Sequence, residues 1–461
     1  MERVSHPCKP SFCLAGLRYH YRCFRSFFGC DILDRQTTRS KVFGWAQNVI
    51  AATGKCYFSL RHYLKHLYFS IHYLELGGAE TSLIGLLQAL DYSKVDVDLF
   101  VYSHRGELMG EIPPQVNRLP EIPEYAQIER PMVDVLKDGY FRMVLARLRA
   151  KREFALYKRR NHPQDGSAIF AYVAKYVTHL LPPIKPSKEY DLAVSFLAPH
   201  DIVLEKVQAK KKVCWVHTDY TKVDMDTDLE FPVWSKYDHI AAVSNAVSEA
   251  FLTRFPTLRD KMLTIPNILS PEWVRSRAEA FSIEAEMPRE PGVTRLLSIG
   301  RFTEAKNFDS VPDICRRIRE KGVNAHWYLI GYGGDEGLIR QRIAESGMGD
   351  YVRILGKKDN PYPYIKACDI YVQPSRYEGS PVTVREAIVL GKPVVATAFP
   401  TVQCVIRDGV DGVIVPMDND GCAAGIARFI QKEGVFFRPD NAQIFTENTL
   451  SLQRFYSLCQ P

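Results

Sequence analysis

Short apolar runs alternate with amphipathic helical stretches along the chain from residue 65 onward. Such alternation predicts parallel β-strands joined by right-handed helical crossovers. The first series of runs is Leu67–His72, Val97–Tyr102, Leu192–Phe196, Val213–His217, Ile240–Val243 and Met262–Ile265. The second series is Arg295–Ile299, Trp327–Ile330, Val352–Leu355, Ile370–Gln373, Val394–Ala396 and Val413–Val415. Two series predict an α/β fold class with two Rossmann-like, doubly wound domains.

A polar, proline-bearing stretch, Pro266–Gly292, separates the two series and has few strand signals. We therefore expect an N-terminal domain over 65–275, a linker over 276–292, a C-terminal domain over 293–445 and a final helix over 446–461. Residues 1–64 show no sustained period. We expect them to be an N-terminal extension, either disordered or lying before the true start of the protein.

Composition places the chain among ordinary globular proteins, since 46% of its 461 residues are hydrophobic and 25% are charged. No run reaches the ~18 apolar residues that a membrane span requires, and Met1–Cys30 does not have the pattern of a signal peptide. We expect a cytoplasmic protein, either free or peripheral on the cytoplasmic face of the membrane. The net charge of +7 suits anionic ligands or an anionic membrane surface and does not call for nucleic acid.

A basic segment, residues 137–160, interrupts the alternation of strands and helices. Its apolar residues recur at helical spacing among many Arg and Lys residues. A basic amphipathic helix can lie on an anionic membrane surface. The alternative is a solvated helix whose apolar stripe packs on its own domain.

The strongest candidate site follows the run Ile370–Gln373. Glu378 lies in the loop, Ser380 is placed to cap a helix, and Pro381 is placed at the first helical position. The free amides of Val382 and Thr383 would then form an anion site suited to a diphosphate.

Two carboxylates flank the start of this helix. Glu378 precedes it and Glu386 lies within it. Open α/β sheets bind ligands at the carboxyl ends of their strands, so both can face one cleft there. Carboxylates are good acceptors for vicinal sugar hydroxyls.

Three further candidates lie at strand ends. Arg301 and Lys306 follow the run Arg295–Ile299 and could bind a diphosphate and stabilise its charge. Gly77 and Gly78 precede a helix and would let backbone approach a ligand, although a plain turn explains them equally well. His217 ends an apolar run and either hydrogen-bonds a sugar hydroxyl or is simply packed.

Several rival motifs do not fit. The stretch Gly331–Gly337 lacks the third glycine of a dinucleotide fingerprint, because Glu336 holds that place. Asp96 and Asp98 lie at the start of their strand, away from the ligand edge. Residues 224–228 are a better metal candidate but are best interpreted as a solvated loop. The cysteines form no Cys-x-x-Cys pair, so we expect no metal site.

Together these motifs resemble the retaining glycosyltransferases of the GT-B type, family 4, a group that includes many bacterial polysaccharide-assembling enzymes. The resemblance covers roughly residues 65–455, and its sharpest element is Glu-x7-Glu, formed by Glu378 and Glu386. It implies two domains facing across a cleft, with Arg301 and Lys306 on the donor diphosphate. It also implies Glu386 on the ribose.

The same resemblance assigns the remaining residues. Glu378 would contact the transferred sugar, helped by backbone from Gly379 through Val382 to Thr383. Gly77 and Gly78 would form the opposing lip, and His217 would lie on the acceptor side. The stretch 355–357, with Lys357, resembles the loop that meets the base, and 331–335 resembles a glycine-rich turn of the family. Residues 1–64 match nothing in the pattern.

The function implied is transfer of a sugar from a UDP- or GDP-linked donor to a hydroxyl of a glycan or lipid-linked glycan. The resemblance implies retention of configuration without a metal or other cofactor, in cell-surface polysaccharide biosynthesis. Two alternatives stay open. One is a sugar-nucleotide epimerase on the same double fold, and the other is a catalytically silent scaffold.

Overall fold

The computed structural model describes residues 64–75, 77–163, 166–185, 187–431 and 441–460. The part of the chain that begins at Lys65 forms one compact unit. The predictions made for residues 1–63 lie outside the described residues.

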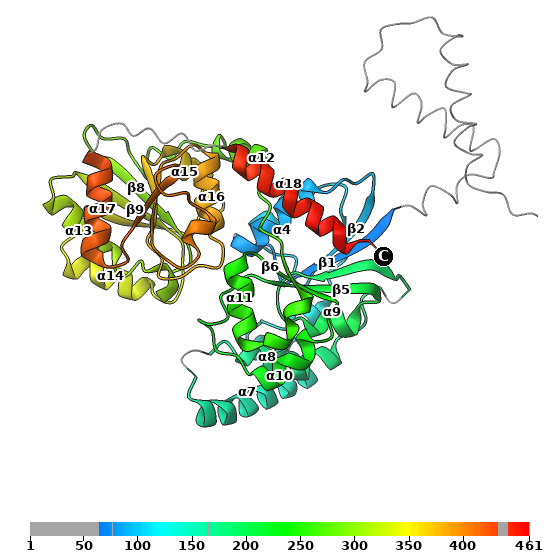
Figure 1. The fold of residues 1–461 in the computed structure, drawn as a ribbon. Helices are drawn as coiled ribbons and strands as arrows, with labels where there is room; N and C mark the ends of the chain where they lie inside the picture. The colour runs from blue at the N-terminus through cyan, green and yellow to red at the C-terminus, as the bar shows by residue number, and fades with distance from the viewer. Residues whose placement is uncertain (1–63, 76, 164–165, 186, 432–440, 461) are drawn as a thin grey trace, which may run out of the picture. The chain divides into compact units, whose positions relative to one another are not determined.

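The N-terminal half folds around a seven-stranded sheet in the order β3-β2-β1-β4-β5-β6-β7 (Figure 1). Every neighbouring pair in it is parallel. Its strands are β1 Lys65–Ile71, β2 Val95–Val101, β3 Asn117–Arg118, β4 Tyr190–Ser195, β5 Ala209–Val216, β6 His239–Ala242 and β7 Met262–Thr264. The order reverses between β1 and β4, as in a doubly wound fold.

The C-terminal half repeats this plan with a six-stranded parallel sheet in the order β10-β9-β8-β11-β12-β13. Its strands are β8 Thr294–Ile299, β9 Ala325–Ile330, β10 Val352–Gly356, β11 Ile370–Gln373, β12 Val394–Thr397 and β13 Gly412–Val415. The reversal lies between β8 and β11. The predicted fold class of two Rossmann-like domains is confirmed.

Helices cover both sheets. Those of the first half are α4 Gly78–Ala89, α5 Pro123–Ala126, α6 Met132–Lys137, α7 Phe141–Asn161, α8 Ile169–Val177, α9 Asp201–Lys206, α10 Thr227–Trp234, α11 Asn245–Arg254 and α12 Pro271–Ala278. Those of the second are α13 Val311–Glu320, α14 Glu336–Glu345, α15 Tyr362–Ala367, α16 Val382–Val389, α17 Asn419–Gln431 and α18 Asn441–Leu458. Short 3-10 turns occur at Glu107–Glu111, Thr178–Leu180, Pro256–Lys261, Glu304–Lys306 and Val402–Cys404.

Each predicted apolar run is a strand in the structure, with ends that differ by a few residues. The short edge strand β3 was missed, because Asn117 and Arg118 are both exposed and polar. The final helix begins at Asn441, earlier than the predicted 446.

The last helix, α18, returns to the first domain and completes its core. Phe455 is fully buried there and stacks on Phe69 with ring centroids 5.8 Å apart. Its ring also lies 6.4 Å from that of Trp215. The chain therefore crosses between the domains a second time, after α17, and the N-terminal core depends on the C-terminal residues.

Helix α7 has two unlike faces. One face packs inward, with Met143 and Ala150 buried and Phe154 against Tyr172 at 5.9 Å between ring centroids. The opposite face exposes an apolar stripe, and the exposed fractions are Phe141 62%, Leu145 65%, Leu148 48% and Leu156 43%. Phe141, Leu145 and Leu148 therefore do not pack on their own domain, whereas Tyr140 and Val144 of the predicted stripe do pack against its core.

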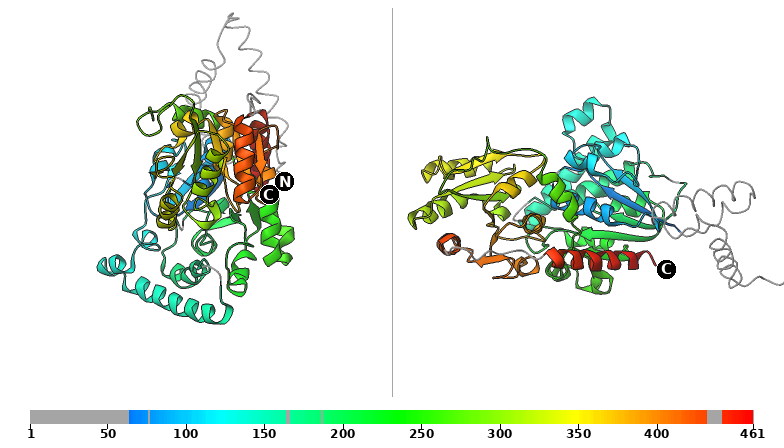
Figure 2. Two further views of the ribbon diagram at one scale, coloured as in Figure 1. Left: turned by 90° about the vertical axis from the view of Figure 1, so that its left-hand side faces the viewer. Right: turned by 90° about the horizontal axis from the view of Figure 1, so that it is seen from above.

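In Figure 1 and in the left view of Figure 2, α7 lies at the edge of its domain, with α8 beside it. Exposed cations flank the apolar stripe, among them Arg142, Arg149, Arg152 and Lys158. Among the residues that the structure describes, no helix is both long and apolar enough to cross a membrane.

The packing of α18 gives a test of the fold. Phe455→Ala should destabilise the N-terminal domain by about 3–5 kcal/mol, the usual range for removing a buried phenylalanine side chain. Phe445→Ala on the same helix is the matched control, since Phe445 is 44% exposed. Urea unfolding followed by tryptophan fluorescence measures both variants, and equal effects would contradict this role of α18.

Candidate active site

The candidate site lies where the order of the second sheet reverses. Strands β8 and β11 are direct neighbours there. The loop after β8 carries Arg301 and Lys306, and the loop after β11 carries Glu378. Parallel strands end at one edge of their sheet, so the two loops meet.

The loop after β8 is tightly bent and packed. Asn307 has a left-handed backbone with φ 57°, and its side-chain amide donates to the Pro374 carbonyl at 3.0 Å. Gly300 leaves room for the lysine, because a Cβ atom built on it would lie 3.0 Å from Cε of Lys306. A side chain at residue 300 would therefore displace Lys306.

The glycine-rich turn after β9 closes over this loop. A Cβ atom on Gly331 would lie 1.9 Å from the Gly300 carbonyl oxygen, and one on Gly333 would lie 2.4 Å from the Phe302 oxygen. Both glycines have φ angles near +150°, a conformation that side chains rarely allow. The turn thus packs backbone against backbone beside Arg301.

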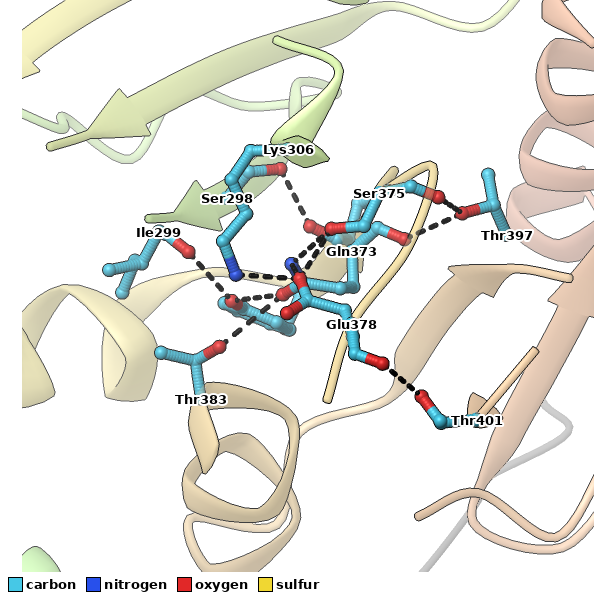
Figure 3. Close-up of polar contacts among 11 residues, drawn as sticks. Ser298, Ile299, Lys306, Gln373, Ser375, Glu378, Thr383, Thr397 and Thr401 are labelled. Atoms are coloured by element: carbon cyan, nitrogen blue, oxygen red, sulfur yellow. Dashed lines mark hydrogen bonds and ion pairs between the residues drawn. The ribbon is translucent and has the colours of Figure 1, made fainter. Parts of the chain in front are cut away.

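Lys306 and Glu378 form the central contact of the site (Figure 3). Nζ of Lys306 lies 2.6 Å from Oε1 of Glu378. The same oxygen accepts hydrogen bonds from the Gln373 amide at 2.9 Å and from the Ser375 hydroxyl at 2.6 Å. The ion pair is largely buried, with the two side chains 20% and 10% exposed. Three donors therefore fix the carboxylate of Glu378.

A hydrogen-bond relay orients Gln373 toward this carboxylate. Its Oε1 accepts from the Tyr371 hydroxyl at 2.8 Å and from the Thr383 hydroxyl at 3.3 Å. Nε2 of the same amide then donates to the Ser375 hydroxyl at 2.8 Å and to Glu378. Thr383 thus contributes its side chain to the site from the first turn of α16.

Further contacts join the two loops. The Arg376 amide donates to the Ala305 carbonyl at 2.8 Å, and its guanidinium pairs with Asp309 at 2.9 Å. The Thr401 hydroxyl donates to the Glu378 carbonyl at 2.8 Å. The position of Glu378 is consequently set by backbone as well as by side-chain contacts.

The start of α16 differs from the prediction. The helix is capped at Pro381, without a side-chain cap bond, so the predicted cap at Ser380 is wrong. The reason is that Pro381 is extended, with ψ 96°, and its carbonyl accepts the Val384 amide at 3.2 Å. Within the described residues, the amides of Val382 and Thr383 have no backbone acceptor. The first turn can still bind an anion.

Glu386 lies deeper in α16 and is not in contact with Glu378. It is 3% exposed, and the Tyr362 hydroxyl donates to its Oε1 at 2.8 Å. Burial raises the pKa of this carboxyl to about 7. Tyr362 thus occupies one oxygen of the carboxylate that the resemblance assigns to the ribose.

Glycines bring the first domain against this site. A Cβ atom on Gly379 would lie 2.3 Å from the His217 carbonyl oxygen, and one on Gly78 would lie 3.6 Å from the Val382 side chain. The Ser244 hydroxyl donates to the Gly379 carbonyl at 3.4 Å. The helix starts of α4 and α16 therefore oppose each other, as the resemblance implies for the two lips.

Gly77 faces its own helix. A Cβ atom on it would lie 2.3 Å from the Glu80 carboxylate. Glu80 is buried, and burial raises the pKa of its carboxyl.

His217 is held by backbone and is electrically neutral near pH 7. Its Nε2–H donates to the Phe196 carbonyl at 3.0 Å. Burial lowers the pKa of the imidazole to about 4. Nδ1 is then the unprotonated nitrogen and can accept a proton or a hydrogen bond.

Two candidate cations contact the first domain instead of Glu378. Arg301 lies close to the Tyr73 side chain of the first domain and lowers the pKa of its hydroxyl, against the larger rise that burial causes. Lys357 lies 2.6 Å from Glu107 and 3.9 Å from Glu75. The structure therefore brings Lys306, Glu378, Gly379 and Thr383 together and leaves Arg301 and Lys357 at the facing surface.

The aspartates of the rival metal motifs form ion pairs and a helix cap. Asp98 forms ion pairs with Lys185 at 3.2 Å and with Lys188 at 3.1 Å. Asp226 caps α10 by accepting the Leu229 amide at 3.2 Å. In the described part of the chain no group of three His, Cys, Asp or Glu residues is placed to hold a metal ion.

Residues that the sequence did not single out complete the site. Gln373 and Tyr371 belong to the buried strand β11, and Tyr362 belongs to α15. A glutamine at the end of an otherwise apolar strand is the one signal that could have pointed to this relay. No sequence period distinguishes Tyr362 from a core tyrosine.

Both sheets, their strand order and the site at the second switch point define a two-domain α/β protein with the GT-B architecture. Residues 293–432 match the family described as "Glycosyl transferases group 1". This segment contains Arg301, Lys306, Glu378 and Glu386.

Curated relatives align with 30% of the chain. It is similar to the amylovoran biosynthesis glycosyltransferase AmsK of Erwinia amylovora, 31% identical over 148 residues, which are 30% of this chain and 36% of that protein. It is also similar to the lipopolysaccharide core biosynthesis glycosyltransferase LpsE of Rhizobium meliloti, 31% identical over 137 residues, 30% of this chain and 38% of that protein. The matches thus span little more than a third of these relatives.

Solved structures extend the likeness of fold to both domains. HepE of Anabaena, in complex with UDP and glucose, superposes with a TM-score of 0.58 at 15% identity, over 85% of this chain and 100% of that one. A mutant of TarM from S. aureus, in complex with Fondaparinux, alpha-GlcNAc-glycerol and UDP, gives 0.59 at 11% identity, over 86% and 100%.

The burial of Glu386 predicts a pH effect on stability. Since the folded protein raises the pKa of this carboxyl to about 7, it binds the proton more tightly than the unfolded chain does. Wild type should therefore lose stability as the pH rises from about 4.5 to about 7, on the order of 3 kcal/mol from this group. Glu386→Gln should lack that loss.

Urea unfolding of wild type and Glu386→Gln at pH 5 and pH 8 measures the difference. The control is Glu345→Gln, because Glu345 lies on the surface of α14 with its side chain 48% exposed. If Glu386→Gln keeps the full pH dependence of wild type, this carboxyl is not the buried acid described above.

Proposed function

We propose that the protein is a nucleotide-sugar-dependent glycosyltransferase of cell-surface polysaccharide biosynthesis. The observation that carries the proposal is the Lys306–Glu378 pair at the β8/β11 switch point. It lies within the segment that matches glycosyl transferases of group 1. The bound UDP in HepE and TarM supports a nucleotide diphosphate as the donor's leaving group.

Lys306 and the first turn of α16 would bind the diphosphate. As the bond between sugar and diphosphate breaks, negative charge grows on the departing oxygen. The ammonium of Lys306 and the amides of Val382 and Thr383 are fixed beforehand, so they stabilise this charge without reorganising. Arg301 adds a second cation once it leaves Tyr73.

Glu378 would act on the transferred sugar. Its Oε1 is saturated by three donors. Its second oxygen is then the one left to accept a sugar hydroxyl, and Lys306 holds it in place. Glu386 would accept the ribose hydroxyls after Tyr362 moves aside, and Lys357 would approach the base.

The acceptor would approach from the first domain. Neutral His217 lies against Gly379 and could accept a hydrogen bond from a sugar hydroxyl through Nδ1. Retention of configuration rests on the Glu-x7-Glu resemblance. The fixed ammonium of Lys306 and the helix amides can supply the charge stabilisation that a metal ion gives in other transferases, so we expect activity in the presence of EDTA.

A sugar-nucleotide epimerase and a silent scaffold are the alternatives. Epimerisation would change the donor without any acceptor, and a scaffold would bind donor without turnover. A thermal-shift panel of UDP- and GDP-linked sugars identifies the donor first. Product analysis with and without acceptor then separates the three functions.

Lys306→Ala tests the proposed role of the ion pair. Loss of one preorganised donor to a developing charge costs about 2.7–4 kcal/mol, so donor turnover should fall roughly a hundred- to thousandfold. Lys366→Ala is the control, because Lys366 lies on α15 with its side chain 48% exposed. Circular dichroism must show that both variants fold. Near-wild-type turnover in folded Lys306→Ala would remove Lys306 from the mechanism.

We further propose that the exposed stripe of α7 docks on an anionic membrane. The support is the combination of Phe141, Leu145 and Leu148 on the solvent face with flanking arginines. An amphipathic helix of this kind lies in the membrane interface with its apolar face buried. Docking would bring the first domain near a lipid-linked acceptor.

Sedimentation with phosphatidylglycerol vesicles tests this docking. The double change Leu145→Asp and Leu148→Asp should weaken binding on the order of tenfold or more. Wild-type binding should also weaken with salt, since charges are screened within about 8 Å at physiological ionic strength. Leu338→Asp on α14 is the control, as Leu338 is 39% exposed. Equal sedimentation of all variants would contradict the role of α7.

A further inference from the structure

A cavity of about 320 Å³ lies in the first domain and is lined by residues between 167 and 234. Helices α8 and α10 form its sides. Its floor comes from the loops that follow β4 and β5, which contribute Pro199 and Thr218. In Figure 1, α8 and α10 lie next to each other beside α7. The cavity thus opens at the carboxyl edge of the first sheet, the edge that binds ligands in this class of fold.

Aromatic rings form much of the cavity wall. Phe170, Tyr220 and Trp234 all line it. Trp234 is 2% exposed and is fixed by Tyr220, with ring centroids 5.9 Å apart. Phe170 is 63% exposed although it belongs to an ordered helix. A large exposed ring beside a cavity is suited to cover a ligand.

The polar lining includes a buried histidine and two largely buried carboxyl groups. His200 is 4% exposed, and burial lowers the pKa of its imidazole to about 3. Burial raises the pKa of Asp201 to about 6 and that of Glu230 to about 7. Among the described residues neither carboxyl has an ion-pair partner.

The one lysine and the exposed histidine of the lining already have partners. Lys175 lies 2.9 Å from Glu153, and His179 lies 3.2 Å from Glu205. A phosphate or carboxylate in the cavity would meet acidic groups without a matching cation, at a high desolvation cost. The lining therefore disfavours anionic ligands, including the diphosphate of a lipid carrier.

We infer that this cavity, named here the α8–α10 pocket, binds an uncharged saccharide unit of the acceptor. Sugar rings present C–H faces that pack on aromatic side chains, and their hydroxyls donate to carboxylates and histidine nitrogens. Thr218 of the lining directly follows His217, whose carbonyl meets Gly379 of the donor loop. An acceptor seated here would extend toward the site of transfer. This inference rests on the proposed function.

Saturation-transfer NMR on the full-length protein tests the pocket. The probes are the methyl glycosides of glucose, galactose, mannose and N-acetylglucosamine, with glucuronate as the anionic probe and farnesyl phosphate as the lipid probe. UDP and GDP in the same samples report the donor site independently. The variants are Phe170→Ala and Asp201→Asn, with Phe445→Ala on α18 as the control.

At least one neutral glycoside should give a signal, and glucuronate should give none. Phe170→Ala should weaken glycoside binding about tenfold through loss of the ring face, and Asp201→Asn should also weaken it. Both should leave the nucleotide signal unchanged, and Phe445→Ala should change neither.

Three results would overturn the inference: no signal from any neutral glycoside, equal signals in wild type and Phe170→Ala, or binding of farnesyl phosphate alone. A nucleotide signal with no glycoside signal would overturn the pocket and leave the proposed function standing. Glycoside signals that depend on Phe170, without any nucleotide signal, would support the pocket and count against the donor site.

Discussion

One oxygen atom of Glu378 holds the two halves of the candidate site together. It accepts from Lys306 of the loop after β8, from Gln373 at the end of β11 and from Ser375 of the following loop. A buried carboxylate with fewer partners would be strongly destabilising, because its desolvation would go uncompensated. The hydroxyls of Tyr371 and Thr383 bind Oε1 of Gln373, so its NH2 group points toward Glu378. The side chains of the anion-binding edge are therefore oriented around this acceptor, while Arg376 and Asn307 join the same loops through separate contacts.

The first domain contacts the second through close backbone approaches and through one packed side chain. Gly379 lies against His217, Gly78 faces Val382, and α18 crosses back to pack Phe455 into the first core. The two glycines permit the close approach of the domains because they carry no side chain. A donor bound at the β8/β11 edge would thus lie directly beneath the first domain. The acceptor would arrive over the carboxyl ends of β4 and β5. The strand order of the two sheets would therefore place the donor on the second sheet and the acceptor on the first.

The sequence predicted the fold well and the site in part. Apolar runs identified the long strands because buried parallel strands are nearly continuous in apolar residues. The spacing of Lys306 and Glu378 from their strands sufficed to predict that they converge. The cap at Ser380 was wrong because the backbone of Pro381 is extended. The cover that Tyr362 forms over Glu386 was not predictable, since it joins residues of different helices through a contact without any sequence period. The exposed face of α7 was only one of two alternatives, because periodicity alone does not reveal which stripe faces the domain.

The central claim is that a nucleotide diphosphate binds where the loops after β8 and β11 meet. Hydrogen–deuterium exchange with UDP-glucose and with GDP-mannose tests it most directly, since protection reports which backbone amides the ligand covers. One of the two ligands should slow exchange in residues 300–307 and 378–386, with smaller changes near Gly77 and Gly78. Protection confined to other parts of the first domain, or unchanged exchange in both loops at saturating ligand, would contradict the account.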